Sequence, residues 1–88
     1  MPLNESEPPA GGGALPLHML RNGDRAVVVG VQGGHGMQRR MADMGLIPGA
    51  EIEVTSDANS TGAVIVRVFE ARIAIGRGMA RRVMVRPI

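Results

Sequence analysis

Apolar and polar residues alternate along the C-terminal half of the chain with the period of two that is typical of half-buried β-strands. Ile52 and Val54 alternate with acidic residues, and later segments repeat this alternation with valine and isoleucine. An earlier apolar run is rich in β-branched residues, which predicts a strand covered on both faces, and Gly30 within it indicates a bulge or bend. Strands are predicted at residues 25–31, 51–55, 63–69, 72–75 and 82–86.

The hydrophobic period changes to that of a helix between the first two strands. Met37, Met41 and Met44 recur at the i, i+4, i+7 spacing of one helical face, which predicts a helix over residues 37–44. Gly45 follows where a helix commonly ends in a left-handed residue, and Pro48-Gly49 fits the centre of a type II turn.

Short connecting elements complete the predicted order. Pro16 suits the first turn of a short helix over residues 17–20, with Leu17 and Leu20 facing inward. Gly-rich or polar loops are expected at 32–36 and 57–62, and tight turns at 70–71 and 76–80.

Five short strands and one inserted helix predict a mainly β domain, a small antiparallel barrel of about five strands. Residues 15–88 form this single domain, and the Pro-, Gly- and acid-rich residues 1–14 are predicted to be a disordered tail. A chain of 88 residues buries only about 60% of its unfolded surface, so each apolar face is needed for stability.

Composition excludes several classes of protein. Cysteine is absent, which excludes disulfides and thiolate metal sites. No apolar run approaches the ~18 residues that span a bilayer, and the N-terminus lacks the pattern of a signal peptide, so a soluble cytoplasmic protein is expected. The pI near 11.0 follows mainly from the absence of lysine and tyrosine, with a net charge of only +2.

The positive charge is concentrated at the C-terminal end. Residues 67–88 contain six arginines and one acid, Glu70. Such a cluster is either a solvated surface or a docking face for an acidic partner or an anionic surface.

Candidate chemistry is sparse, which favours a non-catalytic protein without a cofactor. The two histidines have no carboxylate partner at a fixed spacing. His35 lies in a predicted loop and is the weak candidate for a metal ligand; the methionines at helical spacing are more typical of core packing. The glycines at 33, 34 and 36 lack the residues of a phosphate-binding loop.

Binding of nucleic acid through its bases is disfavoured as well. Phe69 is the single aromatic residue, whereas single-stranded nucleic acids and proline-rich ligands are held largely by aromatic side chains. Contact of arginines with an RNA backbone stays open as an alternative.

Protein–protein contact is the function that these features favour. Leu46 and Ile47 lie between two glycine-controlled bends, beside the methionine-bearing helix. In a barrel too small to leave apolar surface unused, we expect Leu46 to be buried and Ile47, next to Pro48, to be exposed. The predicted partner-binding residues are Met37, Arg40, Met41, Met44, Leu46, Ile47 and Pro48.

The sequence also resembles a known family. Asn22-Gly23-Asp24, the segment QRRMADMGLIPG at 38–49, Ile52-x-Val54, Ile73-Ala74-Ile75 and Val83-x-Val85 together resemble the FeoA family over about residues 16–87. It departs from the family at Glu70-Ala71, where glycine is frequent, and at Met41, where leucine is usual.

The resemblance implies an SH3-like barrel and an accessory, regulatory role in bacterial ferrous iron uptake. The implied partner is the cytosolic GTPase part of the FeoB membrane transporter, so membrane contact would be indirect. A related domain occurs in iron- and manganese-dependent repressors, which leaves a metal-binding or metal-sensing module as the alternative. The oligomeric state, including a homo-oligomer, is left open.

Overall fold

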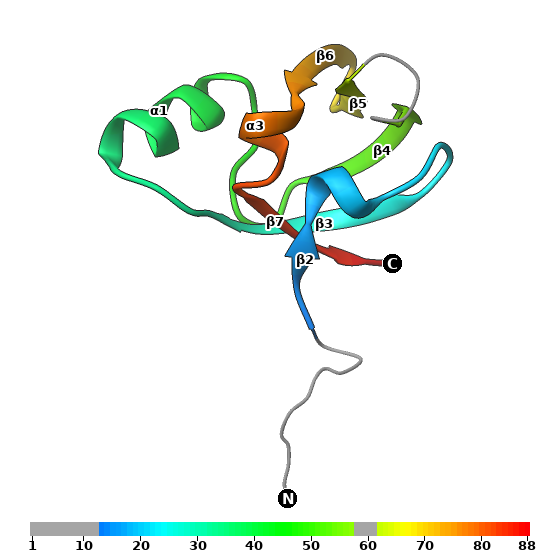
Figure 1. Cartoon of the computed structure of the whole chain (residues 1–88), viewed down its shortest axis with the longest axis horizontal. Coiled ribbons are helices and arrows are strands. Elements are labelled where there is room, and N and C mark those ends of the chain that lie inside the picture. The colour runs from blue at the N-terminus through cyan, green and yellow to red at the C-terminus, as the bar shows by residue number, and fades with distance from the viewer. Residues whose placement is uncertain (1–12, 58–61) are drawn as a thin grey trace, which may run out of the picture.

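An antiparallel β-sheet of six strands forms the body of the domain (Figure 1). The computed structural model describes residues 13–57 and 62–88. Its strands are β2 (Leu15–Pro16), β3 (Arg25–Val31), β4 (Glu51–Ser56), β5 (Ala63–Val68), β6 (Ala71–Gly76) and β7 (Val83–Pro87). The helices are the 3-10 helix η2 (Leu17–Met19), α1 (His35–Asp43) and α3 (Arg77–Ala80).

The order of the strands is β2-β7-β3-β4-β5-β6, and every neighbouring pair is antiparallel. The mainly β class is thus confirmed. About five strands were predicted, and the sheet has six. The sixth is β2, which the pattern missed because it has only two residues, one of them a proline without an N–H.

Among the described strands, β2 and β6 are the edge strands of the sheet and do not pair with each other. The predicted barrel is therefore not closed by hydrogen bonds between strands. The two edge strands are connected by packing instead. α3 lies against β5, β6 and η2, and η2 lies against β7. Short helical segments therefore occupy the place where further strand pairing would be needed for closure.

Several local expectations can be compared with the structure. The register of β3 against β7 shifts between Val28 and Gly30, which confirms the predicted irregularity at Gly30. Leu17 and Leu20 are buried, as their spacing predicted, although the expected short helix is a single 3-10 turn. Residues 77–80 form the helix α3 rather than only a tight turn, since Ala80 is buried and anchors one helical turn on the sheet.

The turn of the β5–β6 hairpin was predicted at residues 70–71, and in the structure it lies one residue earlier. β5 ends at Val68, which pairs with Ala71, so Phe69 and Glu70 form the two-residue loop. Phe69 has a φ of 55° and is 70% exposed. A chain reversal this tight needs a positive φ, which a strand residue cannot supply.

One apolar core holds the sheet, η2, α1 and α3 together. Its members share near-complete burial, and the largest are Leu17, Met41, Leu46, Ile75, Val28, Val54, Val64, Val66, Val68, Val83 and Val85. The inward residues of β4, β5 and β7 follow the predicted alternation. Strand periodicity in the sequence therefore located most of the core.

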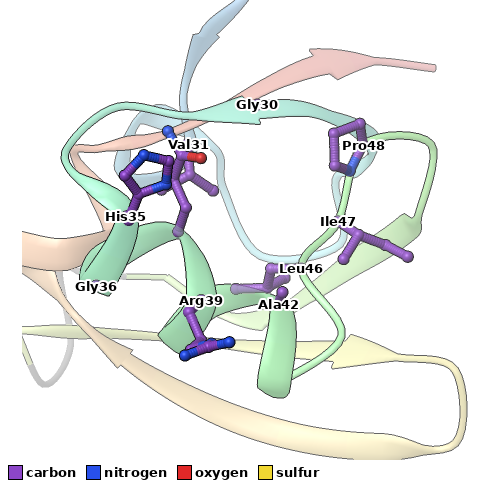
Figure 2. A pocket seen from close by; sticks show the side chains of 10 residues that line it. Gly30, Val31, His35, Gly36, Arg39, Ala42, Leu46, Ile47 and Pro48 are labelled. Atoms are coloured by element: carbon purple, nitrogen blue, oxygen red, sulfur yellow. The ribbon is translucent and has the colours of Figure 1, made fainter.

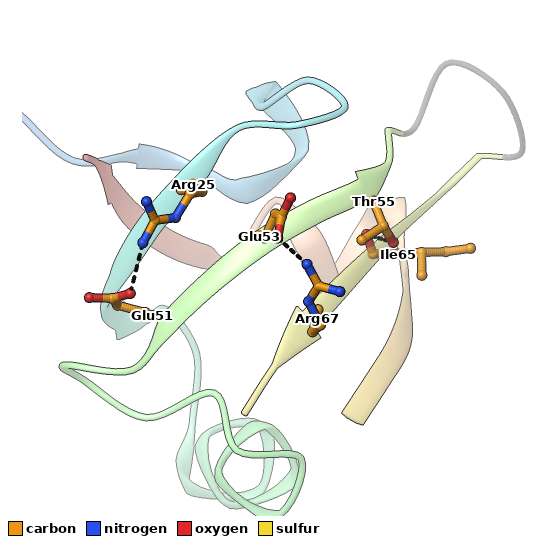
Figure 3. Close-up of polar contacts among 6 residues, drawn as sticks. All are labelled: Arg25, Glu51, Glu53, Thr55, Ile65 and Arg67. Carbon is orange, nitrogen blue, oxygen red and sulfur yellow. Dashed lines mark hydrogen bonds and ion pairs between the residues drawn. The ribbon is translucent and has the colours of Figure 1, made fainter. Parts of the chain in front are cut away.

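The solvent-facing side of β3, β4 and β5 carries cross-strand polar contacts (Figure 3). Arg25 pairs with Glu51 at 3.2 Å, and Arg67 pairs with Glu53. Thr55 Oγ1 donates a hydrogen bond to the carbonyl of Ile65 at 3.2 Å. Both ion pairs are solvent-exposed, so each adds at most about 1 kcal/mol and their main effect is to favour one strand register.

The predicted disordered tail falls largely outside the described residues. Only Gly13 and Ala14 of residues 1–14 belong to the described part, and both are exposed. The tail therefore stays a prediction.

Candidate functional site

A surface groove of about 760 Å³ separates α1 from the end of β3 (Figure 2). β3 contributes Gly30 and Val31, and the segment after α1 contributes Leu46, Ile47 and Pro48. The helix contributes His35, Gly36, Gln38, Arg39 and Ala42. The groove is thus enclosed by one strand end, one helix face and one turn.

α1 presents two different faces. Met37, Met41 and Met44 point to the core, with Met41 fully buried and the other two half-buried. His35, Arg39 and Ala42 have the i, i+4, i+7 spacing of the opposite face and line the groove. Packing of the methionine face therefore leaves a polar face with one small residue, Ala42, along the groove.

The end of α1 fixes the position of the turn. Leu46 N–H donates to the carbonyl of Met41, and Gly45 N–H donates to that of Ala42, both at 2.9 Å. Gly45 has a φ of 91°. This is the Schellman arrangement, and burial of Leu46 with Met41 supplies the apolar contact that accompanies it.

A second bend follows immediately and is bonded to the sheet. Ala50 N–H donates to the carbonyl of Ile47 at 3.0 Å, and Gly49 has a φ of 94°, as expected for a type II turn. Gly49 N–H and the Ala50 carbonyl both bond to the backbone of Val28, at 2.7 and 2.9 Å. Ile47 and Pro48 therefore project from a turn that is fixed on both sides.

The expected division between the two apolar turn residues is confirmed. Leu46 is buried, whereas Ile47 is 43% exposed. Figure 2 shows the Ile47 and Pro48 side chains on the rim of the groove. Leu46 lies below them and joins the helix to the core.

The predicted set of partner-binding residues is only partly on the surface. Met41 and Leu46 are fully buried and have no free surface for a partner, because the small core needs both side chains. Ile47, Pro48 and Arg40 are exposed, although Arg40 does not line the groove.

Two features of the groove, and one residue beside the end of α1, were missed from the sequence. The helix begins at His35, two residues earlier than predicted, so His35 and Gly36 belong to α1 and not to the preceding loop. Arg39 and Ala42 share its face, a spacing that a search for polar helix faces would have found. Phe69 was also missed: its ring lies 3.4 Å from where a Cβ on Gly45 would stand, beside the end of α1.

The groove offers one imidazole and one guanidinium rather than a set of metal ligands. Within the described residues, His, Cys, Asp and Glu form no group of three or more that could hold a metal ion. The polar side chains that line the groove are those of His35, Gln38 and Arg39, and each can form hydrogen bonds. Its polar helix face and apolar rim suit contact with the surface of another molecule.

This small antiparallel β domain, with one helix inserted between two strands and a rigid turn exposed beside it, has the architecture of the SH3-like class of domains. Residues 15–87 match the family model described as the FeoA domain. The chain therefore belongs to the FeoA family.

Relatives support this assignment over most of the chain. A Methanocaldococcus jannaschii protein provisionally named Fe(2+) transport protein A is 34% identical over 70 residues, which covers 80% of this chain and 83% of that protein. A crystal structure described as an iron uptake regulatory protein, FeoA, is 42% identical, with a TM-score of 0.78, and the match covers 86% of this chain and 99% of that one.

A zinc complex of Stenotrophomonas maltophilia FeoA, described as a prokaryotic SH3 domain protein, has 29% identity and a TM-score of 0.72, over 82% of this chain and 89% of that one. A manganese-dependent transcriptional repressor has a TM-score of 0.80 at 22% identity. The match covers 92% of this chain but 44% of the repressor, and it shows a shared fold.

Family membership implies an accessory role in ferrous iron transport. In the part of the chain that is described, the helices are too short and too polar to cross a membrane. The family is known as a transport accessory and not as an enzyme family.

Proposed function

We propose that this protein docks on the cytosolic GTPase part of a FeoB-type ferrous iron transporter and regulates it without catalysing a reaction itself. The observation that carries the proposal is the exposed Ile47–Pro48 turn, held rigidly between α1 and β3 beside an open groove. We call Ile47 and Pro48 the apolar knob. Because the turn that carries it is rigid, the knob loses little conformational freedom on binding, and more of its contact energy contributes to affinity. The proposed place of action is the cytoplasm.

The proposed contact surface consists of Ile47 and Pro48 with the groove face of α1. The apolar knob would enter a recess of the transporter domain, while Arg39 and Gln38 offer hydrogen-bond donors at its edge. Apolar anchors surrounded by polar groups are typical of the residues that dominate binding energy at protein interfaces.

Replacement of Ile47 tests the proposal. Leu46 is left unchanged, because an aspartate at that buried position would disrupt the core. We expect Ile47→Asp to weaken binding to the isolated cytosolic domain by about 2 kcal/mol, roughly thirtyfold in Kd, measured by calorimetry. Unfolding curves should show that the variant keeps its stability.

Ile88→Asp is the matched control. Ile88 is 59% exposed, and its N–H bonds to the carbonyl of Arg25 at the start of β3, whereas the groove lies at the end of that strand. The same chemical change there should leave Kd within about twofold. Equal binding by the wild type and by folded Ile47→Asp would refute the proposed contact.

A metal-binding or metal-sensing role has weaker support. The zinc complex of the Stenotrophomonas maltophilia protein is the observation in its favour. His35 is exposed, and among the described residues it belongs to no group of three or more His, Cys, Asp or Glu side chains that could hold a metal ion. The likeness to metal-dependent repressors below 25% identity concerns the fold alone and adds nothing for this role.

A further inference from the structure

A second pocket, of about 440 Å³, lies where η2 meets α3. It is separate from the groove and shares none of its lining residues. The side chains and backbone around it come from three places in the sequence, and they are His18, Met19, Leu20, Arg21, Asp57, Arg77 and Arg81.

The fold itself brings these residues together. Leu17 of η2 and Ala80 of α3 are both fully buried, and they anchor the two short helices against the core. His18 directly follows one anchor, and Arg81 directly follows the other. Arg81 N–H bonds to the carbonyl of Arg77 at 3.0 Å, so these two arginines lie one helical turn apart, on the same side of α3.

The pocket has an excess of positive charge. Three arginines and a histidine line it, against one carboxylate, that of Asp57. Arginine presents a planar fork of donors that matches the oxygens of phosphate groups better than lysine does. The three arginines and Asp57 together leave two positive charges in excess. A phosphate ester carries a charge of about −1.5 to −2 at neutral pH, which nearly balances this excess.

His18 supplies a second, independent observation. Its Nδ1 is buried and has no hydrogen-bond partner, and it is the single buried side-chain nitrogen or oxygen in that condition among the residues described. Buried polar atoms are nearly always paired with protein, water or a ligand. A ligand or water bound at the pocket that His18 lines would supply the missing partner.

We propose that this pocket binds a phosphate-type oxyanion carried by a small molecule. In this proposal His18 of η2 and Arg81 at the end of α3 hold the anion, and Arg21, which also lines the pocket, adds a further guanidinium. The volume lies within the range of small-ligand sites. Binding along a nucleic acid strand is disfavoured, because none of the described residues that line the pocket is an aromatic residue on which bases could stack.

The test is a titration of the full chain, ¹⁵N-labelled, with sodium phosphate and separately with glycerol phosphate, followed by NMR. Sodium chloride at matched ionic strength is the reference. We expect saturable shifts at His18, Arg21 and Arg81 that chloride does not reproduce. Tighter binding of glycerol phosphate points to a phosphate ester as the ligand, whereas equal or weaker binding points to the free ion.

Variants separate a built site from general attraction of anions. Arg81→Gln removes one exposed arginine from the pocket and should weaken binding roughly tenfold or more, because it deletes charge-assisted hydrogen bonds. Arg86→Gln removes an equal charge from β7, outside the pocket, and should change Kd less than about twofold. His18→Ala should weaken binding as well.

The proposal is overturned if chloride gives the same shifts, if Arg86→Gln weakens binding as much as Arg81→Gln does, or if shifts do not saturate. Tighter binding of a short RNA, equally reduced by both arginine variants, would also overturn it. The amide spectrum of each variant shows that it is folded, and Arg81 is exposed, so its replacement leaves the core intact.

Discussion

Phe69 is the residue that departs most from ordinary backbone behaviour. Its φ of 55° lies in the left-handed region, and it is the one non-glycine residue there in the described part of the chain. This conformation destabilises a bulky residue by about 1–2 kcal/mol, because its Cβ approaches the following carbonyl oxygen. At 70% exposure the ring recovers little of that through burial.

Comparison of Phe69→Gly with Phe69→Ala isolates the strain. Both variants remove the ring, and they differ only in the Cβ at this backbone conformation. We expect the glycine variant to be more stable by about 1 kcal/mol, the reverse of the usual order in regular structure. Urea unfolding of the two variants measures the difference, and a more stable alanine variant would show that no strain exists.

At the scale of elements, the decisive feature is the junction of α1 with the turn that follows it. The helix is nine residues long, and isolated helices of that length are unstable in water. It persists because Met41 and Leu46 anchor its C-terminal end and Gly45 reverses the chain. Because this end is anchored, the face of α1 that carries Arg39 and Ala42 is turned toward the groove.

Gly45→Ala tests this junction, with Gly36→Ala as its control in the same helix. At Gly45 an added Cβ meets the Phe69 ring at 3.4 Å in a left-handed conformation, so we expect a loss of about 1–2 kcal/mol. At Gly36 nothing lies within 4 Å, and alanine should stabilise the helix by about 0.5–1 kcal/mol. Thermal or urea unfolding should therefore give changes of opposite sign, and equal signs would contradict this account of the helix end.

For the whole molecule, the shared core makes α1 depend on the sheet. Unfolding free energies of small domains are about 5–15 kcal/mol in total. One buried side chain is therefore a large fraction of the stability of this domain. Met41 is such a residue, because it joins the helix to the strands.

Met41→Ala should lower the unfolding free energy by about 2–5 kcal/mol. The exposed Met19 gives the control, since the same change there should alter stability by less than about 0.5 kcal/mol. Denaturant titrations of both variants measure the two values. A Met41→Ala loss no larger than that of Met19→Ala would mean that the helix is not part of the cooperative unit.

Much of the fold followed from local patterns. The alternation in β4, β5 and β7 predicted their inward residues, and the methionine spacing predicted α1 and its buried face. β2 and α3 were missed, because two- and four-residue elements carry no measurable period and exist only through their neighbours. For the groove, the exposed Ile47 beside Pro48 followed from the sequence, whereas Arg39 and Ala42 were missed because only the apolar face of the helix was traced.

By itself, the sequence determined the periodicities, the glycine-controlled bends at Gly45 and Gly49, and the family motif, since each depends on residues close together in the chain. The exposure of Ile47 and the burial of Leu46 were expected from the sequence, but only the tertiary structure decided the packing that produces them. Ile47 is exposed and Leu46 is buried because the packing of α1 against the sheet leaves room for one of them. It also decided that His18 and Arg81 share a pocket, because contact between η2 and α3 joins segments that no local pattern connects.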